Sequence, residues 1–310
     1  MNDTARNAHA DLRALAGGVA VITGGASGIG FALAEKSIGL GLHPVLADIE
    51  APAIRQAEAR LATAARTADV EVFGFPVDVS READVNALAA AVAERFPDRP
   101  VQLLCCNAGV GGGGPVLRAS DIDWDFVLGV NVKGVANCIR AFVPEMLERR
   151  VAGSVVTTSS QDGLCAAQGV YGVSKHACVA LTEALYQELQ GRLTAHVLCP
   201  NAVATNIITS ERNRPERYGG PRGGGPNPIA ERFKAFGMPP SRCAEFVFDA
   251  IRTGTFYIMA EAEEDPGYVY SEAETRMQAI LGGGLPYRPR SAFLSKVFDP
   301  NTPLPTREED

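Results

Sequence analysis

Short apolar runs alternate along the chain with longer stretches in which apolar residues recur every three or four positions. The short runs have the composition of buried strands, and the longer stretches have the period of amphipathic helices. The predicted strands cover residues 19–23, 44–48, 70–77, 101–106, 153–159, 194–199 and 255–260, and the predicted helices cover 28–41, 50–66, 80–96, 121–149, 171–190 and 241–253. This alternation predicts an α/β fold, a parallel sheet with helices on both faces and ligands at the carboxyl ends of the strands.

Three stretches fall outside the alternation. Residues 1–16 are predicted to form a loose arm. Residues 206–240, called the lid segment below, contain many glycines and prolines, so we expect few regular backbone hydrogen bonds and high mobility there. Residues 262–310 extend past the last strand, include a predicted amphipathic helix at 272–281, and end in an acidic, proline-rich tail. All three are assigned to a single domain spanning residues 1–310, and the extension fits either substrate enclosure or subunit packing.

A glycine-rich turn follows the first predicted strand. Gly24, Gly28 and Gly30 stand between an apolar run, residues 19–22, and a predicted helix. Glycines there allow a tight turn and close backbone approach to a pyrophosphate at the helix N-terminus, where free N–H groups and the helix dipole favour anions. Alone, such a cluster is often a plain turn. The order strand, glycines, helix favours a nucleotide site.

Tyr171 and Lys175 stand four residues apart on a predicted helix, so they share one face and can reach one bound molecule. An ammonium ~5 Å from a phenolate stabilises it by roughly 3 kcal/mol at an effective dielectric of ~20, which is about two pKa units. We therefore expect Lys175 to lower the pKa of Tyr171 toward values suited to a general base. The pair alone is common on helices, but together with the glycine turn it indicates hydride-transfer chemistry.

From about Gly17 to Ala260 the chain resembles the short-chain dehydrogenase/reductase family in its single-domain form. The resemblance implies a doubly wound, Rossmann-type sheet and an oxidoreductase that transfers hydride between an alcohol or ketone and a nicotinamide cofactor. It rests on four motifs in family order: the cofactor turn Thr23-Gly24-x-x-Ser27-Gly28-Ile29-Gly30, the adenine pair Asp78-Val79, the strand-four motif Asn107-Ala108-Gly109, and the catalytic set Asn131, Ser160, Tyr171 and Lys175.

The resemblance also implies a role for each catalytic residue. Tyr171 takes the alcohol proton as the nicotinamide accepts hydride, and Lys175 holds the nicotinamide ribose and lowers the Tyr171 pKa. Ser160 orients the substrate oxygen, and Asn131 holds a water that connects Lys175 to solvent. The plainer interpretations are a buried tyrosine, a surface lysine and a strand-end serine.

Ser160 precedes Tyr171 by eleven positions, fewer than is usual in the family, and strict counting selects Thr158 instead. Ser160 is preferred because Ser159-Ser160 is followed by Gly163, as in the family pattern. Two other positions depart from the pattern: Cys106 precedes the strand-four motif where an asparagine is frequent, and Asn201 replaces a glycine after Pro200. The resemblance further implies that Pro200, Val203 and Thr205 contact the cofactor near its carboxamide.

Cofactor choice depends on Asp48, which ends the second predicted strand. Its carboxylate is placed to accept hydrogen bonds from the adenine ribose hydroxyls and to repel a 2′-phosphate. No Arg or Lys is adjacent to Asp48 or stands at Ser27, so NAD is predicted rather than NADP. Asp48 as an N-cap of the helix that follows is compatible with this role.

Composition limits the alternatives. The chain has 310 residues, 46% hydrophobic and 21% charged, which is enough for one large core without disulfides or metals. A net charge of −7, with basic residues only in short surface groups such as Arg212-Asn-Arg214, argues against nucleic acid and acidic membranes. No apolar run reaches the ~18 residues of a membrane span, and the N-terminus is no signal peptide, so a cytoplasmic location is predicted.

Seven cysteines are scattered without a C-x-x-C pattern, which predicts buried, reduced thiols. The four histidines show no ligand spacing with the cysteines, and no metal site is predicted. His176 adjoins Lys175, but a neighbour in sequence points about 100° away around a helix.

The substrate is the least constrained feature. In the resembling family the lid segment covers the substrate; the alternative is a surface loop without a role. Residues 213–218 and the long C-terminus resemble bacterial Cα-dehydrogenases that oxidise lignin-derived aryl ethers. A bulky hydrophobic or aromatic secondary alcohol is therefore predicted, in an apolar pocket lined from the lid segment by Ile207, Ile208, Phe233, Phe236 and Met238. A 3-oxoacyl carrier-protein reductase and a non-catalytic NAD-sensing protein are the alternatives, and a homodimer or homotetramer is expected.

Overall fold

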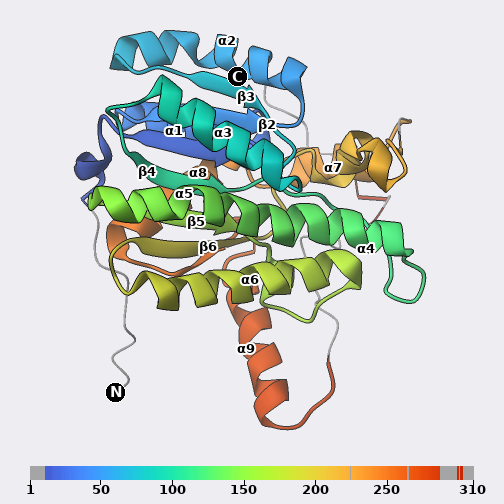
Figure 1. The fold of residues 1–310 in the computed structure, drawn as a ribbon. Helices are drawn as coiled ribbons and strands as arrows, with labels where there is room; N and C mark the ends of the chain where they lie inside the picture. The colour runs from blue at the N-terminus through green and yellow to red at the C-terminus, as the bar shows by residue number, and fades with distance from the viewer. Residues whose placement is uncertain (1–10, 224, 264, 287–298, 300, 303–310) are drawn as a thin grey trace.

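A computed structural model of the chain describes residues 11–223, 225–263, 265–286, 299 and 301–302. Seven parallel strands form one sheet in the order β3-β2-β1-β4-β5-β6-β7 (Figure 1). The strand order reverses direction between β1 and β4, and ligands of doubly wound sheets bind at such a reversal. The strands are β1 (Val19–Thr23), β2 (His43–Asp48), β3 (Phe73–Pro76), β4 (Val101–Cys106), β5 (Ser154–Thr158), β6 (Thr194–Pro200) and β7 (Tyr257–Ala260).

Helices cover both faces of the sheet (Figure 1). One face carries α1 (Gly28–Gly39), α2 (Ala51–Ala68) and α8 (Pro240–Thr253). The other carries α3 (Glu82–Arg95), α4 (Asp121–Leu128), α5 (Val135–Arg149) and α6 (Gly169–Leu189). The predicted α/β fold is confirmed, and the predicted bounds of these elements differ from the observed ones by a few residues.

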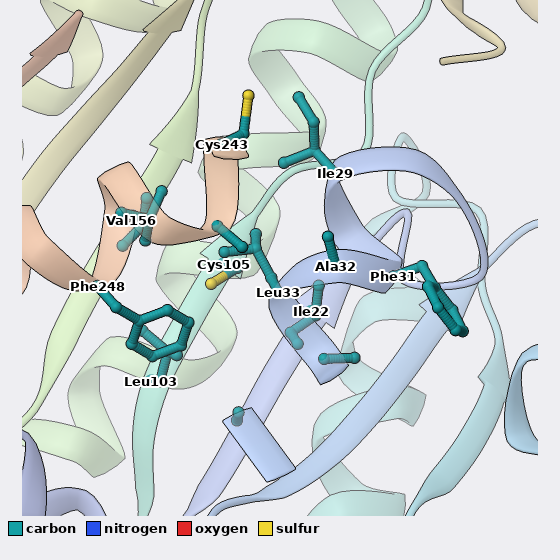
Figure 2. Packing of buried hydrophobic residues seen from close by; sticks show 14 of the residues in the cluster. Ile22, Ile29, Phe31, Ala32, Leu33, Leu103, Cys105, Val156, Cys243 and Phe248 are labelled. Atoms are coloured by element: carbon teal, nitrogen blue, oxygen red, sulfur yellow. The ribbon is translucent and has the colours of Figure 1, made fainter. Parts of the chain in front are cut away.

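The core beneath α1 fixes where the glycine-rich turn lies. Figure 2 shows Leu33 of α1 among Ile22, Leu103 and Cys105 of the central strands, with Phe248 of α8 beside them. Leu33, Ile22, Leu103 and Cys105 have no exposed surface. This packing holds the N-terminus of α1 at the carboxyl edge of the sheet.

The helix predicted at 121–149 contains a π-helical turn, Gly129–Gly134, between α4 and α5. Asn131 lies in this turn and is 1% exposed. Its side chain accepts the Val110 N–H and donates to the Val110 carbonyl and to Ser174 Oγ. Single π turns inside α-helices are frequent at functional sites.

Residues 121–149 together form the one helix in the described part of the chain that is long and apolar enough to cross a membrane. Of its most apolar window, 61% is buried inside the fold. Its apolar side chains, such as Phe126 and Phe142, belong to the core beneath α4 and α5. The apolar character of this helix is therefore explained by packing on the sheet.

The prediction of a loose arm over residues 1–16 is wrong for its last part. Leu12–Leu15 forms a 3₁₀ turn capped by Asp11, and Leu15 is fully buried. The Gln102 amide donates to the carbonyls of Ala14 and Ala152 and ties this turn to the sheet. The segment was too short for a periodic signal. Residues 1–10 lie outside the described part.

The expectation of few regular hydrogen bonds in the lid segment is also wrong for much of its length. It contains 3₁₀ helices at Ile207–Asn213 and Glu216–Tyr218 and the helix α7 (Pro228–Phe236), which is capped by Asn227. The high mobility expected for the lid segment stays a prediction.

The helix expected at 272–281 in the C-terminal extension is longer than predicted: α9 (Tyr268–Leu281) projects below α6 in Figure 1. The acidic end of the tail, residues 303–310, lies outside the described part.

Candidate active site

A cavity of about 710 Å³ opens at the carboxyl ends of the central strands, where the strand order reverses. It is bounded on its outer side by the lid segment, including Ile207 and Phe233. Most residues predicted to bind the cofactor or the substrate line it, namely Gly24, Ser27, Gly28, Ile29, Asp48, Asp78, Val79, Asn107, Ala108, Gly109, Ser160, Tyr171, Lys175, Pro200, Val203 and Thr205. Thr23, Gly30 and Asn131 do not line it. Phe236 and Met238, which were predicted to line the substrate pocket, do not line it either.

The glycine-rich turn has the geometry of a phosphate cradle. Gly24 has a φ of +64°, which favours glycine, and a Cβ on Gly30 would lie 2.1 Å from the Gly24 carbonyl oxygen. Ser27 precedes the first turn of α1 without capping it through its side chain. The N–H groups of that turn are thus left for another acceptor, and the turn lines the cavity. These features fit the pyrophosphate of a dinucleotide cofactor.

Thr23 connects the turn to the strand-four motif rather than lining the cavity. Its hydroxyl donates to the Cys105 carbonyl and accepts the N–H groups of Asn107 and Ala108, both at 3.0 Å. The Asn107 amide in turn donates to the Thr23 carbonyl at 3.1 Å. These bonds hold Asn107 and Ala108 at the floor of the cavity.

Asp48 lies at the end of β2, where its two oxygens accept the N–H groups of Glu50 and Ala26, each at 3.1 Å. Burial raises its pKa, and these backbone hydrogen bonds act in the opposite direction. Two residues further on, Glu50 forms an ion pair with Arg212 of the lid segment. A cation therefore does lie near Asp48, but it comes from a distant part of the chain and is paired.

A second ion pair joins the lid segment to the adenine pair. Arg217 donates to Asp78 Oδ2 at 2.6 Å and to Ser80 Oγ. Asp78 Oδ1 accepts the Ser80 N–H and hydroxyl. The carboxylate expected to contact adenine thus also holds the lid segment.

A third, buried connection joins the lid segment to α4. Arg214 is 1% exposed, which corrects the prediction that residues 212–214 are a surface group. It bonds both oxygens of Glu211 at 2.6 and 2.8 Å and Asp123 at 2.9 Å, and its guanidinium stacks on Phe126. The Ser120 hydroxyl first, and Arg214 with it, lower the pKa of Asp123 to about 2.

Ser160, Tyr171 and Lys175 lie together in the cavity, at the end where the nicotinamide of the cofactor is expected. Lys175 is 3% exposed, donates to the Thr158 carbonyl at 3.0 Å, and lies 5.5 Å from the centre of the Tyr171 ring. A hydrogen bond from Ser160 favours the ionised form of Tyr171. Thr158 instead donates its hydroxyl to Asn107. Thr158 is therefore engaged with Asn107, and Ser160 stays the predicted partner of Tyr171.

The Tyr171 pKa is raised in the structure, so the expected lowering by Lys175 is not observed. Burial raises the pKa of Tyr171 well above its usual value, and the nearby Asp162 carboxylate raises it further. Burial also lowers the pKa of Lys175. Desolvation of the Tyr171 phenol outweighs the effect of one neighbouring charge at this depth.

Asn131 lies directly behind the catalytic group. A Cβ on Gly109 would lie 3.4 Å from both Asn131 Oδ1 and Lys175 Nζ, so the two side chains border the same glycine. Both amide hydrogens of Asn131 are already bonded within the protein. Its side chain therefore has no N–H left for the water that the sequence predicted it to hold.

Comparison with known proteins decides the family. The sequence model for short chain dehydrogenases matches residues 18–216. The chain belongs to the short-chain dehydrogenase family.

It is 33% identical to a Cα-dehydrogenase of a Sphingobium species, over 86% of this chain and 87% of that protein. It also resembles a solved short-chain dehydrogenase/reductase from Burkholderia phymatum in complex with NAD, with 37% identity, a TM-score of 0.79, and coverage of 89% and 99%. A metagenomic short-chain oxidoreductase in complex with NADP has 25% identity, a TM-score of 0.60, and coverage of 80% and 98%.

As a short-chain dehydrogenase, the protein is an oxidoreductase that acts on the CH–OH group of small-molecule alcohols or on the corresponding ketones. All seven cysteines are buried, as predicted. Among the described residues, no group of three or more His, Cys, Asp or Glu is placed to hold a metal ion.

Sequence reasoning missed several polar residues that line the cavity of this short-chain dehydrogenase: Glu50, Gln161, Asp162, Asn201 and Arg212. Glu50 and Asp162 each stand two residues from a predicted site residue, and this proximity was a usable signal. Arg212 gave no signal, because only the fold brings it to Glu50.

Proposed function

We propose that the protein is an NAD-dependent dehydrogenase that oxidises a bulky hydrophobic or aromatic secondary alcohol, with Tyr171 as general base and as general acid in the reverse reaction. The observation that carries the proposal is the meeting of Tyr171, Ser160 and Lys175 at one end of a cavity whose other end is a glycine-rich helix N-terminus. That arrangement suits proton transfer beside a dinucleotide.

Each catalytic side chain has one task in this proposal. Ser160 donates a hydrogen bond to the substrate oxygen, and Tyr171 takes the hydroxyl proton. Lys175 binds the nicotinamide ribose, and Asn131 keeps the π turn and Gly109 in position behind it. The nicotinamide cofactor, when bound, supplies or accepts the hydride.

The choice of NAD is supported by negative charge at the adenosine end of the cavity. Asp48 is placed for the ribose hydroxyls, Glu50 stands two residues further along, and the nearby Arg212 is paired with Glu50. A 2′-phosphate at this position would meet like charge.

The choice of substrate is supported by the wall that the lid segment contributes, which carries Ile207, Ile208, Ile229 and Phe233. The similar Sphingobium protein bears the name of a Cα-dehydrogenase, which fits a benzylic alcohol.

A panel of secondary alcohols tests the proposal, with NAD or NADP and absorbance at 340 nm as the readout. We expect NADH formation with aryl or other bulky alcohols and a lower kcat/KM with NADP. Failure of every alcohol and ketone in the panel with both cofactors would contradict it. Light scattering after size-exclusion chromatography tests the predicted homodimer or homotetramer.

A further inference from the structure

Asp162 brings a carboxylate to the reacting end of the cavity. It lies in the 3₁₀ turn Gln161–Gly163 just after Ser160, and its backbone N–H donates to Ser160 Oγ at 3.2 Å. Asp162 lines the cavity and is half-buried. Among the described residues, none donates a hydrogen bond to its carboxylate. The nearest cation, Lys175, directs its ammonium to the Thr158 carbonyl instead.

Two further polar atoms on this side of the cavity lack partners. Gln161 is 7% exposed and Asn201 is 6% exposed, and both line the cavity. Gln161 Oε1 and Asn201 Nδ2 have no hydrogen-bond partner in the described part of the protein. These two enclosed atoms and the half-buried Asp162 carboxylate make this wall of the cavity polar, and a carboxylate that receives no hydrogen bond from the described residues there indicates a ligand that donates one.

The cavity is therefore polar beside Ser160 and apolar along the lid segment, where Ile207, Ile208 and Phe233 lie. We propose that the substrate carries a hydrogen-bond donor, a hydroxyl or an ammonium group, close to the carbinol carbon, and that Asp162 accepts this donor while the bulky apolar group lies against the lid segment. This inference rests on the proposed function and narrows its substrate class from hydrophobic alcohols to amphipathic diols or amino alcohols.

Recognition of the donor is coupled to proton transfer. The charged and titratable groups that face Tyr171 are Asp162 from the 3₁₀ turn and Lys175 and Cys178 from α6. After burial, the Asp162 carboxylate is the next cause that raises the pKa of Tyr171. A donor bound to Asp162 offsets part of that negative charge, so the matching substrate also makes Tyr171 a stronger acid and easier to ionise.

Three probes with the same carbon skeleton, which differ in whether the terminal carbon carries hydrogen, hydroxyl or amine, test the inference: 1-phenylethanol, 1-phenylethane-1,2-diol and 2-amino-1-phenylethanol. We expect the unmodified protein to use the diol, the amino alcohol or both with a kcat/KM about tenfold or more above that of 1-phenylethanol. A preference for the amino alcohol identifies an ammonium ligand, and a preference for the diol identifies a hydroxyl. Equal use of all three overturns the inference, and this arm needs no variant.

Asp162→Asn locates the preference. We expect this variant to reduce the ratio of kcat/KM for the preferred probe to kcat/KM for 1-phenylethanol to within about threefold. We also expect the acidic limb of the pH profile of kcat/KM for 1-phenylethanol to move to lower pH, because a charge that raises the Tyr171 pKa is gone. Asp98→Asn is the matched control, since Asp98 is exposed at the opposite end of β4, and it should change neither. If neither the kcat/KM ratio nor the acidic limb of the pH profile changes in Asp162→Asn, Asp162 does not recognise the donor.

A binding measurement separates this inference from the proposed function. Calorimetry with the three probes and NADH, on the unmodified protein and on Asp162→Asn, should show the same selectivity without turnover. Selective binding with no turnover of any probe sustains the inference and contradicts the proposed function. Turnover without selectivity in either assay sustains the function and overturns the inference.

Discussion

Tyr171 depends on a single oxygen atom for its proposed role. Tyr171→Phe removes this hydroxyl and keeps the ring that packs in the site, so we expect NADH binding to persist while kcat falls by ~10²–10⁴-fold. Steady-state kinetics and fluorescence titration with NADH measure the two effects. Activity within a few-fold of the parent would falsify the assignment of Tyr171.

At the adenosine end, two carboxylates and one guanidinium act together. Asp48→Ala alone should shift the kcat/KM ratio toward NADP only modestly, because Glu50 remains and holds Arg212. Asp48→Ala with Glu50→Ala should shift it further, since Arg212 is then released to bind a 2′-phosphate. Adding Arg212→Ala to the double variant should reverse that second gain. If the double and triple variants behave alike, Arg212 plays no part in cofactor choice.

At the scale of elements, Arg214 anchors the first half of the lid segment to α4. Arg214→Met removes its bonds to Glu211 and Asp123, and we expect a loss of about 2–3 kcal/mol in unfolding free energy together with faster hydrogen exchange over residues 207–218. Arg222→Met is the matched control: Arg222 also pairs with Asp123 at 2.9 Å, but its side chain is 49% exposed. Its loss should cost less than about 1 kcal/mol. Similar effects of the two variants would show that burial of Arg214 does not increase its contribution to stability.

At the scale of the whole molecule, a neutral histidine inside the sheet makes stability depend on pH. His196 of β6 is fully buried between the Thr255 carbonyl and the Thr194 hydroxyl, and burial lowers its pKa to about 4. The unfolded chain binds this proton near pH 6.5, so the stabilisation present above pH 6.5 is lost as the pH falls toward 4, by up to about 3 kcal/mol. Burial lowers the pKa of His43 and His176 in the same direction.

Urea unfolding at pH 7, 6 and 5 measures this dependence. The stability of His196→Gln should change less with pH than that of the parent, because the group that titrates is absent. Parallel pH dependence in the two proteins would assign the acid sensitivity to other groups.

The sequence by itself determined the order of strands and helices, the glycine-rich turn and the positions of Tyr171 and Lys175. These features depend on local periodicity and short spacing, which act within one or two turns of the chain. It also favours Ser160 over Thr158 as the partner of Tyr171, because the loop pattern around Gly163 is local as well. In the fold Thr158 donates its hydroxyl to Asn107, and the role of Ser160 stays a prediction.

Tertiary structure alone decided what lies next to what across long separations. Arg212, Arg214 and Arg217 reach Glu50, Asp123 and Asp78 only because the lid segment folds back over the carboxyl ends of β2 and β3 and onto α4. Desolvation, which reversed the expected pKa shift of Tyr171, is likewise a property of the assembled core. Charge and burial at a point depend on every segment that packs there, and no local pattern contains that sum.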